Sequence, residues 1–139
     1  MILAAGLGTR LKPLTDTMPK ALVEVGGKPL LDRIILRLRE QGYQRFVVNV
    51  HHFADQIEQH LAEQGNYGVQ VLVSDERAHL LETGGALKRA ASLFVDDTPI
   101  LIHNVDILDN VVSGSTGSNL NLGSTVSRSN LGQTGKAKT

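Results

Sequence analysis

The amino-acid sequence predicts an α/β fold of three layers, in which helices cover both faces of a mainly parallel sheet. Four short apolar runs typical of buried strands alternate with three segments of helical periodicity. This order is typical of parallel sheets with right-handed crossovers. The chain has 139 residues, of which 41% are hydrophobic, so it can form one domain with a core but has no room for two.

Four apolar runs are expected to be the strands, because strands buried on both faces of a sheet read as nearly continuous apolar segments. They lie at residues 1–5, 46–50, 69–73 and 99–105. A helix is expected over 30–41, where apolar residues recur at helical spacing and Gly42 stands in the usual C-cap position. A second helix is indicated by the i, i+4, i+8 spacing of Phe53, Ile57 and Leu61, and a third by apolar residues within 86–94.

Residues 111–139 differ in composition from the rest of the chain. Ser, Gly, Thr and Asn fill more than half of this segment, which has no acidic or aromatic residue. Such a composition cannot bury enough apolar surface to offset the entropy of ordering. We therefore expect a domain over 1–110 and a disordered or loosely attached segment over 111–139. Its cations Arg128, Lys136 and Lys138 leave a second interpretation open, a basic arm that binds a partner.

Charge and composition exclude several classes of partner and chemistry. Fourteen Lys and Arg balance fourteen Asp and Glu, so no overall charge favours nucleic acid or an anionic membrane. The chain has no cysteine, which excludes disulfides, a thiolate nucleophile and Cys-ligated zinc. No apolar run approaches the roughly 20 residues that span a bilayer, and no basic flank of a signal peptide is present. We expect a soluble, cytoplasmic protein.

A glycine-rich loop follows the first predicted strand. Gly6 and Gly8 permit a tight turn whose backbone N–H groups can face an anion. Arg10 and Lys20 add a guanidinium and an ammonium, which both suit phosphate oxygens. The spacing does not fit a P-loop, and Leu11 stands where a dinucleotide fingerprint needs a third glycine. Two interpretations of the loop stay open, a glycine turn that serves only to change the direction of the chain and a polyphosphate site of another kind. Ligands of such sheets bind beyond the carboxyl ends of the strands, where this loop lies.

Several blocks of sequence together resemble one family of enzymes. The blocks are 3–15 (LAAGLGTRLKPLT), 19–20 (PK), 26–30 (GGKPL), 74–77 (SDER), 80–86 (LLETGGA) and 103–106 (HNVD). They resemble the sugar-1-phosphate nucleotidyltransferases, in particular the bacterial branch of mannose-1-phosphate guanylyltransferases and N-acetylmuramate-1-phosphate uridylyltransferases. The resemblance covers about residues 1–110 and implies a Rossmann-like nucleotidyltransferase fold whose C-terminal half is missing from this chain.

The resemblance implies a role for each matching residue. Residues that would lie along the base and ribose are Leu3, Ala5 and Gly6. Residues that would hold the β- and γ-phosphates are Gly8, Thr9 and Arg10. Residues that would line the nucleobase pocket are Glu82, Thr83 and Gly84. Arg10 and Lys20 would be catalytic, with Lys20 reaching the α-phosphate and the sugar phosphate. Asp106 would bind Mg²⁺.

The implied reaction joins a nucleoside triphosphate, UTP or GTP, to a sugar-1-phosphate and releases pyrophosphate. The attacking phosphate has a second pKa of about 6 and is largely dianionic at neutral pH, so the reaction needs no general base. It needs cations that bring two anions together and stabilise the leaving group. Magnesium commonly takes one or two carboxylates together with substrate phosphates, and Asp106 can supply one.

Some of these residues also have simpler interpretations. Asp106 can be a turn residue or a helix N-cap, and Thr83 can cap the third helix. Lys20 can be an ordinary solvated lysine after Pro19, and Lys28, beside a hairpin-like glycine turn, is expected to be one. The adjacent His51 and His52 suggest a zinc pair, but neighbouring residues on a strand point to opposite faces, which argues against one.

Three functional hypotheses remain open from the sequence. The first is a sugar-1-phosphate nucleotidyltransferase of which this chain is a truncated form, weakly active or inactive because the sugar-binding half is missing. The second is a noncatalytic nucleotide-binding module. The third is a phosphocholine-type cytidylyltransferase, which the 81–85 block disfavours. The sequence predicts no oligomeric state.

Overall fold

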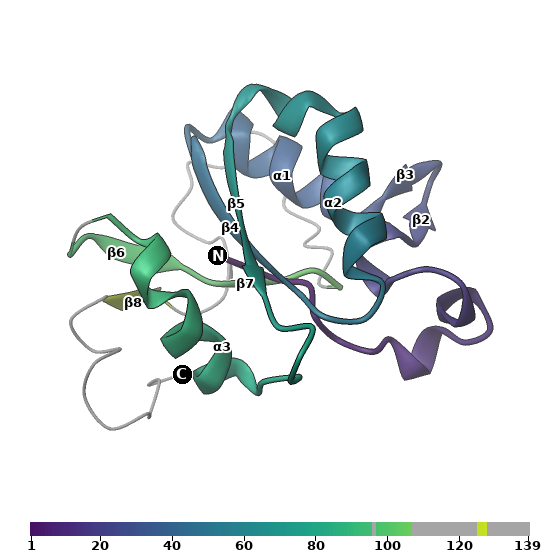
Figure 1. Ribbon diagram of the computed structural model, residues 1–139. Helices are drawn as coiled ribbons and strands as arrows, with labels where there is room; N and C mark the ends of the chain where they lie inside the picture. The colour runs from purple at the N-terminus through teal and green to yellow at the C-terminus, as the bar shows by residue number, and fades with distance from the viewer. Residues whose placement is uncertain (96, 107–124, 128–139) are drawn as a thin grey trace.

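The computed structural model describes residues 1–95, 97–106 and 125–127. Its centre is a parallel sheet of four strands, which confirms the predicted fold class. In spatial order the strands are β5 (Gln70–Asp75), β4 (Arg45–Val50), β1 (Ile2–Leu3) and β7 (His103–Asn104). Figure 1 shows β4 and β5 running side by side past the N-terminus.

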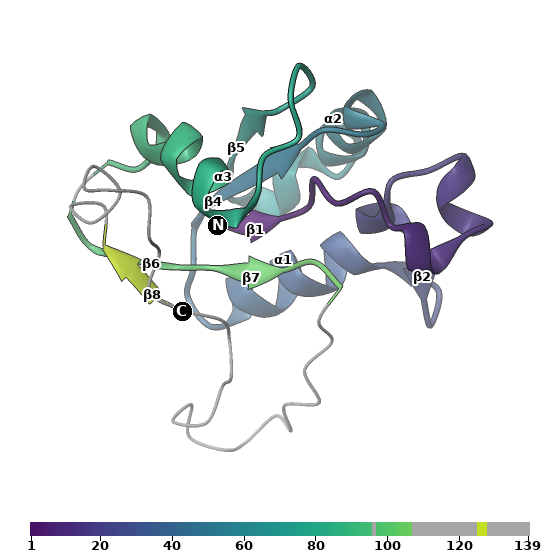
Figure 2. The ribbon, with the colours of Figure 1, turned by 90° about the horizontal axis from the view of Figure 1, so that it is seen from below.

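Helices cover both faces of this sheet. One core cluster joins α1 (Leu30–Glu40) and α2 (Ala54–Glu63) to Phe46, Val48 and Val50 of β4. A second cluster joins α3 (Thr83–Ala90) to Val47 of the same strand. The alternation follows from strand geometry, because successive side chains point to opposite faces. Figure 2 shows α3 and α1 on opposite sides of β1, as the three-layer prediction required.

The first helix ends as the sequence predicts. Gln41 is its C-cap, and Gly42 follows with φ +99°, a conformation that glycine adopts without steric cost. The amide of Gly42 donates to Arg39 O at 2.9 Å, and that of Tyr43 donates to Leu38 O at 3.1 Å. These bonds satisfy carbonyls that the end of a helix leaves without partners.

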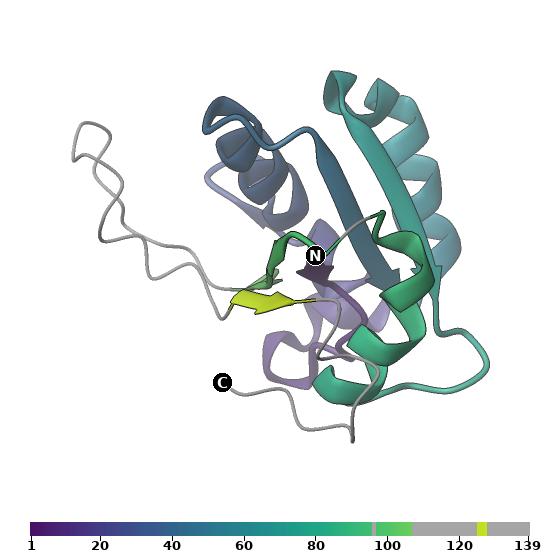
Figure 3. The same cartoon turned by 90° about the vertical axis from the view of Figure 1, so that its left-hand side faces the viewer.

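Two predicted strands differ from the structure. The run 99–105 forms β6 (Pro99–Leu101) and β7, and only β7 pairs with β1. The pairing of β1 with β7 starts at Ile2 and His103, so β6 lies before the part of the run that pairs with β1. It pairs instead with β8 (Thr125–Ser127), in antiparallel orientation; β8 is drawn in yellow in Figure 3. The first strand ends at Leu3 because the next two amides bond to a side chain of β4 and leave the ladder.

Shorter elements connect the sheet and helices. The glycine turn at 26–27 joins the predicted hairpin, formed by β2 (Glu24–Val25) and β3 (Lys28–Pro29). The remaining elements are 3-10 helices, named η1 (Thr9–Leu11), η2 (Leu14–Asp16), η3 (Lys20–Leu22), η4 (Gly65–Gly68) and η5 (Ala91–Leu93).

The prediction of a disordered segment over 111–139 lies outside the described residues, apart from the three residues of β8. In the described part of the chain, the helices are too short and too polar to cross a bilayer.

The α-amino group of Met1 is buried where β1 begins, and it donates to Leu101 O at 2.5 Å. Burial lowers the pKa of this amine from 8.0 to about 5. Between these pH values the unfolded chain binds the proton and the folded chain does not, so stability increases with pH. We expect the free energy of unfolding, measured in urea, to fall as the pH is lowered from 8 towards 5, by up to about 1.4 kcal/mol per pH unit.

A short N-terminal extension is the control for this prediction. It converts the amine into an amide, which can make the same bond to Leu101 without carrying a charge. The extended chain should show a weaker pH dependence over this range. Equal slopes for the two chains would contradict the assignment to Met1.

Candidate nucleotide site

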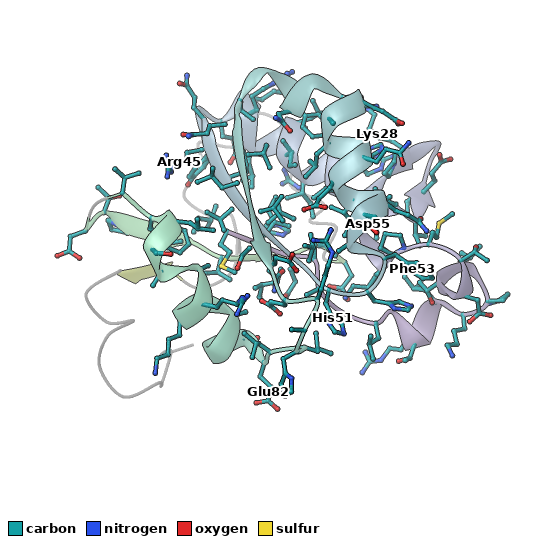
Figure 4. All side chains as sticks on the ribbon, in the orientation of Figure 1. Lys28, Arg45, His51, Phe53, Asp55 and Glu82 are labelled. Carbon is teal, nitrogen blue, oxygen red and sulfur yellow. The ribbon has the colours of Figure 1, made fainter. Side chains whose placement is uncertain are left out.

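A cavity of about 750 Å³ opens beyond the carboxyl ends of β1 and β7. These strands flank the point at which the strand order reverses, since β4 and β5 lie on one side of β1 and β7 on the other. Ligands of open α/β sheets bind at this switch point. Figure 4 shows His51 and Glu82 toward this end of β4 and Arg45 at the other. The cavity is lined by Leu3, Ala5, Gly6, Lys20, Asn49, Leu80, Leu81, Glu82, Thr83, Gly84, Ala86 and Asn104.

The glycine loop between β1 and η1 is held by one threonine. Gly8 has φ +65° and precedes η1, where the amide of Leu11 donates to Gly8 O at 2.9 Å. The buried hydroxyl of Thr15 donates to the same oxygen at 2.7 Å. A Cβ at Gly8 would lie 2.7 Å from Cγ2 of Thr15, so this close approach requires glycine.

Lys20 brings its ammonium group over this loop. A Cβ at Gly6 would lie 3.0 Å from Lys20 Nζ, so the absent side chain of Gly6 makes room for the cation. Lys20 Nζ also lies 3.3 Å from Oδ2 of Asp106, which follows β7. The side chain of Lys20 is 17% exposed and that of Asp106 is 50% exposed. The structure thus brings together the cation that begins η3 and a carboxylate that follows β7, beside the cavity.

The opposite wall is the start of α3. Its N-cap is Glu82, which corrects the alternative that Thr83 caps the helix, and its N-cap side chain makes no capping bond. The helix begins at Thr83, three residues before the apolar periodicity starts, because Ala86 N donates to Glu82 O at 2.8 Å. Thr83 and Gly84 lie in the first turn, whose N–H groups lack intrahelical partners and carry the positive end of the helix dipole.

The loop between β5 and α3 is fastened by Arg77. Its guanidinium contacts Asp75 at 2.5 Å, Asp55 of α2 at 2.8 Å, and also Glu58 of α2. The backbone N–H of Arg77, aided by this guanidinium, lowers the pKa of Asp75. The carboxylates of Glu58 and Asp75 in turn raise the pKa of Arg77. Through Arg77, the loop that carries Leu80 and Leu81 to the cavity is therefore tethered to α2.

The structure gathers most, but not all, of the predicted site. The predicted residues that line the cavity are Leu3, Ala5, Gly6, Lys20, Glu82, Thr83 and Gly84. Gly8, Thr9 and Arg10 are not among the lining residues, and Arg10 is exposed. Their roles as phosphate ligands stay predictions.

Sequence reasoning missed five lining residues and a buried carboxylate next to them. The lining residues that it missed are Asn49, Leu80, Leu81, Ala86 and Asn104. The carboxylate is Glu76, which is 1% exposed and bonded to Asn49. Asn49 and Asn104 stand near the ends of strands, so the rule that locates ligands beyond strand ends could have found them.

The two adjacent histidines do not form a pair. His51 Nδ1 lies 2.6 Å from Glu76 O, whereas the ring of the exposed His52 packs against Phe53 with centroids 4.0 Å apart. Among the residues the structure describes, no three His, Cys, Asp or Glu residues are grouped as metal ligands. A single carboxylate such as that of Asp106 suits a cation like Mg²⁺, which takes most of its ligands from phosphates and water, and this role stays a prediction.

A doubly wound parallel sheet with a cavity at its switch point defines the class of α/β ligand-binding domains. The pattern of the nucleotidyl transferase family matches residues 1–112, and this chain belongs to that family. The expected family resemblance is therefore confirmed.

Three relatives illustrate the match. The N-acetylmuramate alpha-1-phosphate uridylyltransferase of Caulobacter vibrioides is 48% identical over 108 residues, which cover 76% of this chain and 44% of that protein. The choline-phosphate cytidylyltransferase of Streptococcus pneumoniae is 44% identical over 78 residues, 56% of this chain and 33% of that protein. The crystal structure of HddC from Yersinia pseudotuberculosis complexed with GMP-PN superposes with a TM-score of 0.67 and 35% identity, over 76% of this chain and 46% of that one. The chain thus spans less than half the length of these relatives.

Proposed function

We propose that this chain forms the nucleotide-binding half of a sugar-1-phosphate nucleotidyltransferase, which transfers a nucleoside monophosphate from UTP or GTP to a sugar-1-phosphate. The observation that carries the proposal is the cavity in which Lys20 of the β1 side faces Glu82 and Thr83 of the α3 side. The printed activity of the Caulobacter relative supports uridylyl transfer, and the ligand of HddC supports a guanine nucleotide.

Each wall would serve one part of the nucleotide. Leu3, Leu80 and Leu81 give apolar surface on which a base can lie, while Glu82 and the first N–H groups of α3 can bond to its polar edge. Lys20 is the only cationic side chain among the described residues that line the cavity, and it would bind the α-phosphate and the incoming sugar phosphate. Its charge would offset the repulsion between the two anions.

Magnesium would be held by Asp106 together with the phosphates. When bound, the ion neutralises phosphate charge and helps to orient the leaving pyrophosphate. Lys20 and Asp106 form a pair beside the cavity, so the arrival of a metal-bound triphosphate would give each of them a new partner of opposite charge.

A thermal-shift panel tests the proposal. UTP, GTP, CTP and ATP are each added with Mg²⁺, because a ligand that binds only the folded state raises the midpoint of unfolding as its occupancy rises. UTP or GTP should give the largest shift. A shift with CTP alone would favour the cytidylyltransferase hypothesis that the Streptococcus relative suggests. If the chain binds a nucleotide but releases no pyrophosphate when sugar-1-phosphates are added, the result would support the hypothesis of a noncatalytic nucleotide-binding module. The absence of any shift would overturn the proposal.

Asp106→Asn should remove the magnesium dependence of nucleotide binding. The amide keeps the size of the side chain but loses the charge that a hard cation needs. We expect Mg²⁺ to strengthen nucleotide binding by the original chain at least about 10-fold, and by the variant far less, in calorimetric titrations with and without EDTA; a tenfold change corresponds to about 1.4 kcal/mol. Asp97→Asn is a matched control, because Asp97 is exposed and does not line the cavity. An unchanged response in Asp106→Asn would refute the metal assignment.

A further inference from the structure

Two buried polar side chains, Asn49 and Glu76, lie between the two walls of the cavity. Asn49 is the fifth residue of β4 and is 3% exposed, and Glu76 directly follows β5 and is 1% exposed. A buried carboxylate is costly unless hydrogen bonds satisfy it. The bonds that satisfy this one connect parts of the chain that are distant in sequence.

Asn49 holds the end of β1. The backbone ladder between β1 and β4 ends where Leu3 lies opposite Asn49. Beyond that point the Oδ1 atom of Asn49 accepts the amide of Ala4 at 2.6 Å and that of Ala5 at 3.3 Å. A side-chain oxygen thus takes the place of strand carbonyls, and β1 can leave the sheet toward the glycine loop without losing these bonds.

Glu76 holds both Asn49 and the opposite wall. Its Oε1 accepts from Nδ2 of Asn49 at 3.0 Å, and its Oε2 accepts from the amide of Leu81 at 3.3 Å. An ionised carboxylate only accepts, so it orients the amide of Asn49 with Nδ2 toward Glu76 and Oδ1 toward β1. One continuous path therefore runs from Ala5 to Leu81, and both of these residues line the cavity.

We propose that Asn49 and Glu76 are positioning residues that hold the two walls of the cavity at a fixed separation. Hydrogen bonds to neighbouring residues would be enough to satisfy one buried carboxylate. Here the bonds instead reach from the end of β1 on one wall to Leu81 on the other. The consequence for nucleotide affinity rests on the proposed function. The coupling of the walls does not, because it is a property of the chain without ligand.

The path of hydrogen bonds from Ala5 through Asn49 and Glu76 to Leu81 is called the relay. Exchanging donor and acceptor in its central bond, between Asn49 and Glu76, tests it. In Glu76→Gln, the side chain has one accepting oxygen for two donors, so one bond is lost and a donor faces a donor. In Asn49→Asp, two carboxylates stand where the Nδ2 to Oε1 bond of 3.0 Å was. In the double variant N49D/E76Q, the introduced glutamine can donate to the introduced carboxylate and still accept from Leu81, while that carboxylate accepts from Ala4 and Ala5. All the bonds are restored, and only the central bond has its donor and acceptor exchanged.

Amide hydrogen exchange in the chain without ligand is the first measurement. Glu76→Gln should speed exchange by about 10-fold at Leu81 and also at Ala4 and Ala5, consistent with the loss of a charge-assisted hydrogen bond. The double variant should return to within about threefold of the original rates. Exchange at Val48, in the centre of β4, reports global unfolding and corrects for any loss of stability. Glu63→Gln, on the exposed side of α2, is the matched control.

Calorimetric titration with Mg²⁺-UTP and Mg²⁺-GTP is the second measurement. Each single variant should weaken binding by about 10-fold and the double variant should recover most of it, which a merely structural defect would not do. Exchange that rises at Leu81 but not at Ala4 and Ala5, or a double variant no better than the worse single one, would overturn the relay. If the original chain binds no nucleotide, the proposed function is wrong, and the exchange rates alone decide whether the walls are coupled.

Discussion

Lys20→Ala is expected to weaken binding of a magnesium-bound triphosphate by about 100-fold while leaving the fold almost unchanged. The variant removes the only cationic side chain among the described lining residues and leaves the carboxylate of Asp106, 3.3 Å away, without this partner. A hydrogen bond to a charged group contributes about 1.5–3 kcal/mol, and a partly buried cation facing several phosphate oxygens makes more than one. Calorimetric titration with Mg²⁺-UTP and Mg²⁺-GTP measures the loss.

Lys28→Ala is the matched control, because it makes the same change in charge away from the cavity. Lys28 lies on the exposed hairpin and, in Figure 4, stands far from Glu82. Its loss should change affinity less than about twofold, because exposed charges are screened. Lys20→Arg should recover only part of the affinity, since the space above Gly6 accommodates an ammonium and the guanidinium is larger. Equal nucleotide affinities for Lys20→Ala and the original chain would show that the triphosphate does not bind at Lys20.

The sequence predicted the layers and the place of the site because both depend on local patterns. Alternating periodicity placed the central strands and the helices on both faces, and strand ends located the cavity near Gly6. The spacing of Lys20 after the glycine loop suggested a phosphate-binding cation, although an ordinary solvated lysine fits the same spacing. These inferences need only the spacing of residue types along the chain.

The parts that sequence reasoning missed depend on contacts between distant segments. Glu76 looked like one member of a charged block, and only its burial against Asn49 and Leu81 reveals a linking role. The split of the predicted strand 99–105 has the same origin, because it follows from where β1 begins and from a partner strand at 125–127. Neither fact is encoded in the periodicity of the run itself.

The glycine loop provides the second large effect. Gly8→Ala should lower the free energy of unfolding by about 3 kcal/mol, since an alanine at φ +65° is disfavoured by about 1–2 kcal/mol and crowding in a packed site adds about 1–3 kcal/mol. The new Cβ would lie 2.7 Å from Cγ2 of Thr15 and 3.1 Å from Cβ of Lys20. Because Lys20 must move, nucleotide affinity should fall together with stability. Urea denaturation and nucleotide titration measure the two losses.

Two further variants separate backbone strain from crowding. Gly27 has φ +75° and no heavy atom within 4 Å of its would-be Cβ, so Gly27→Ala carries the strain alone and should cost about 1 kcal/mol. Thr15→Ser keeps the hydroxyl that donates to Gly8 O and removes the crowding methyl group, so adding it to Gly8→Ala should restore part of the stability. If Gly8→Ala lowers the free energy of unfolding no more than Gly27→Ala does, Thr15 does not pack against Gly8 as closely as the structure shows. The loop would then not fix the position of Lys20, because only close packing around Gly8 holds the cation in place.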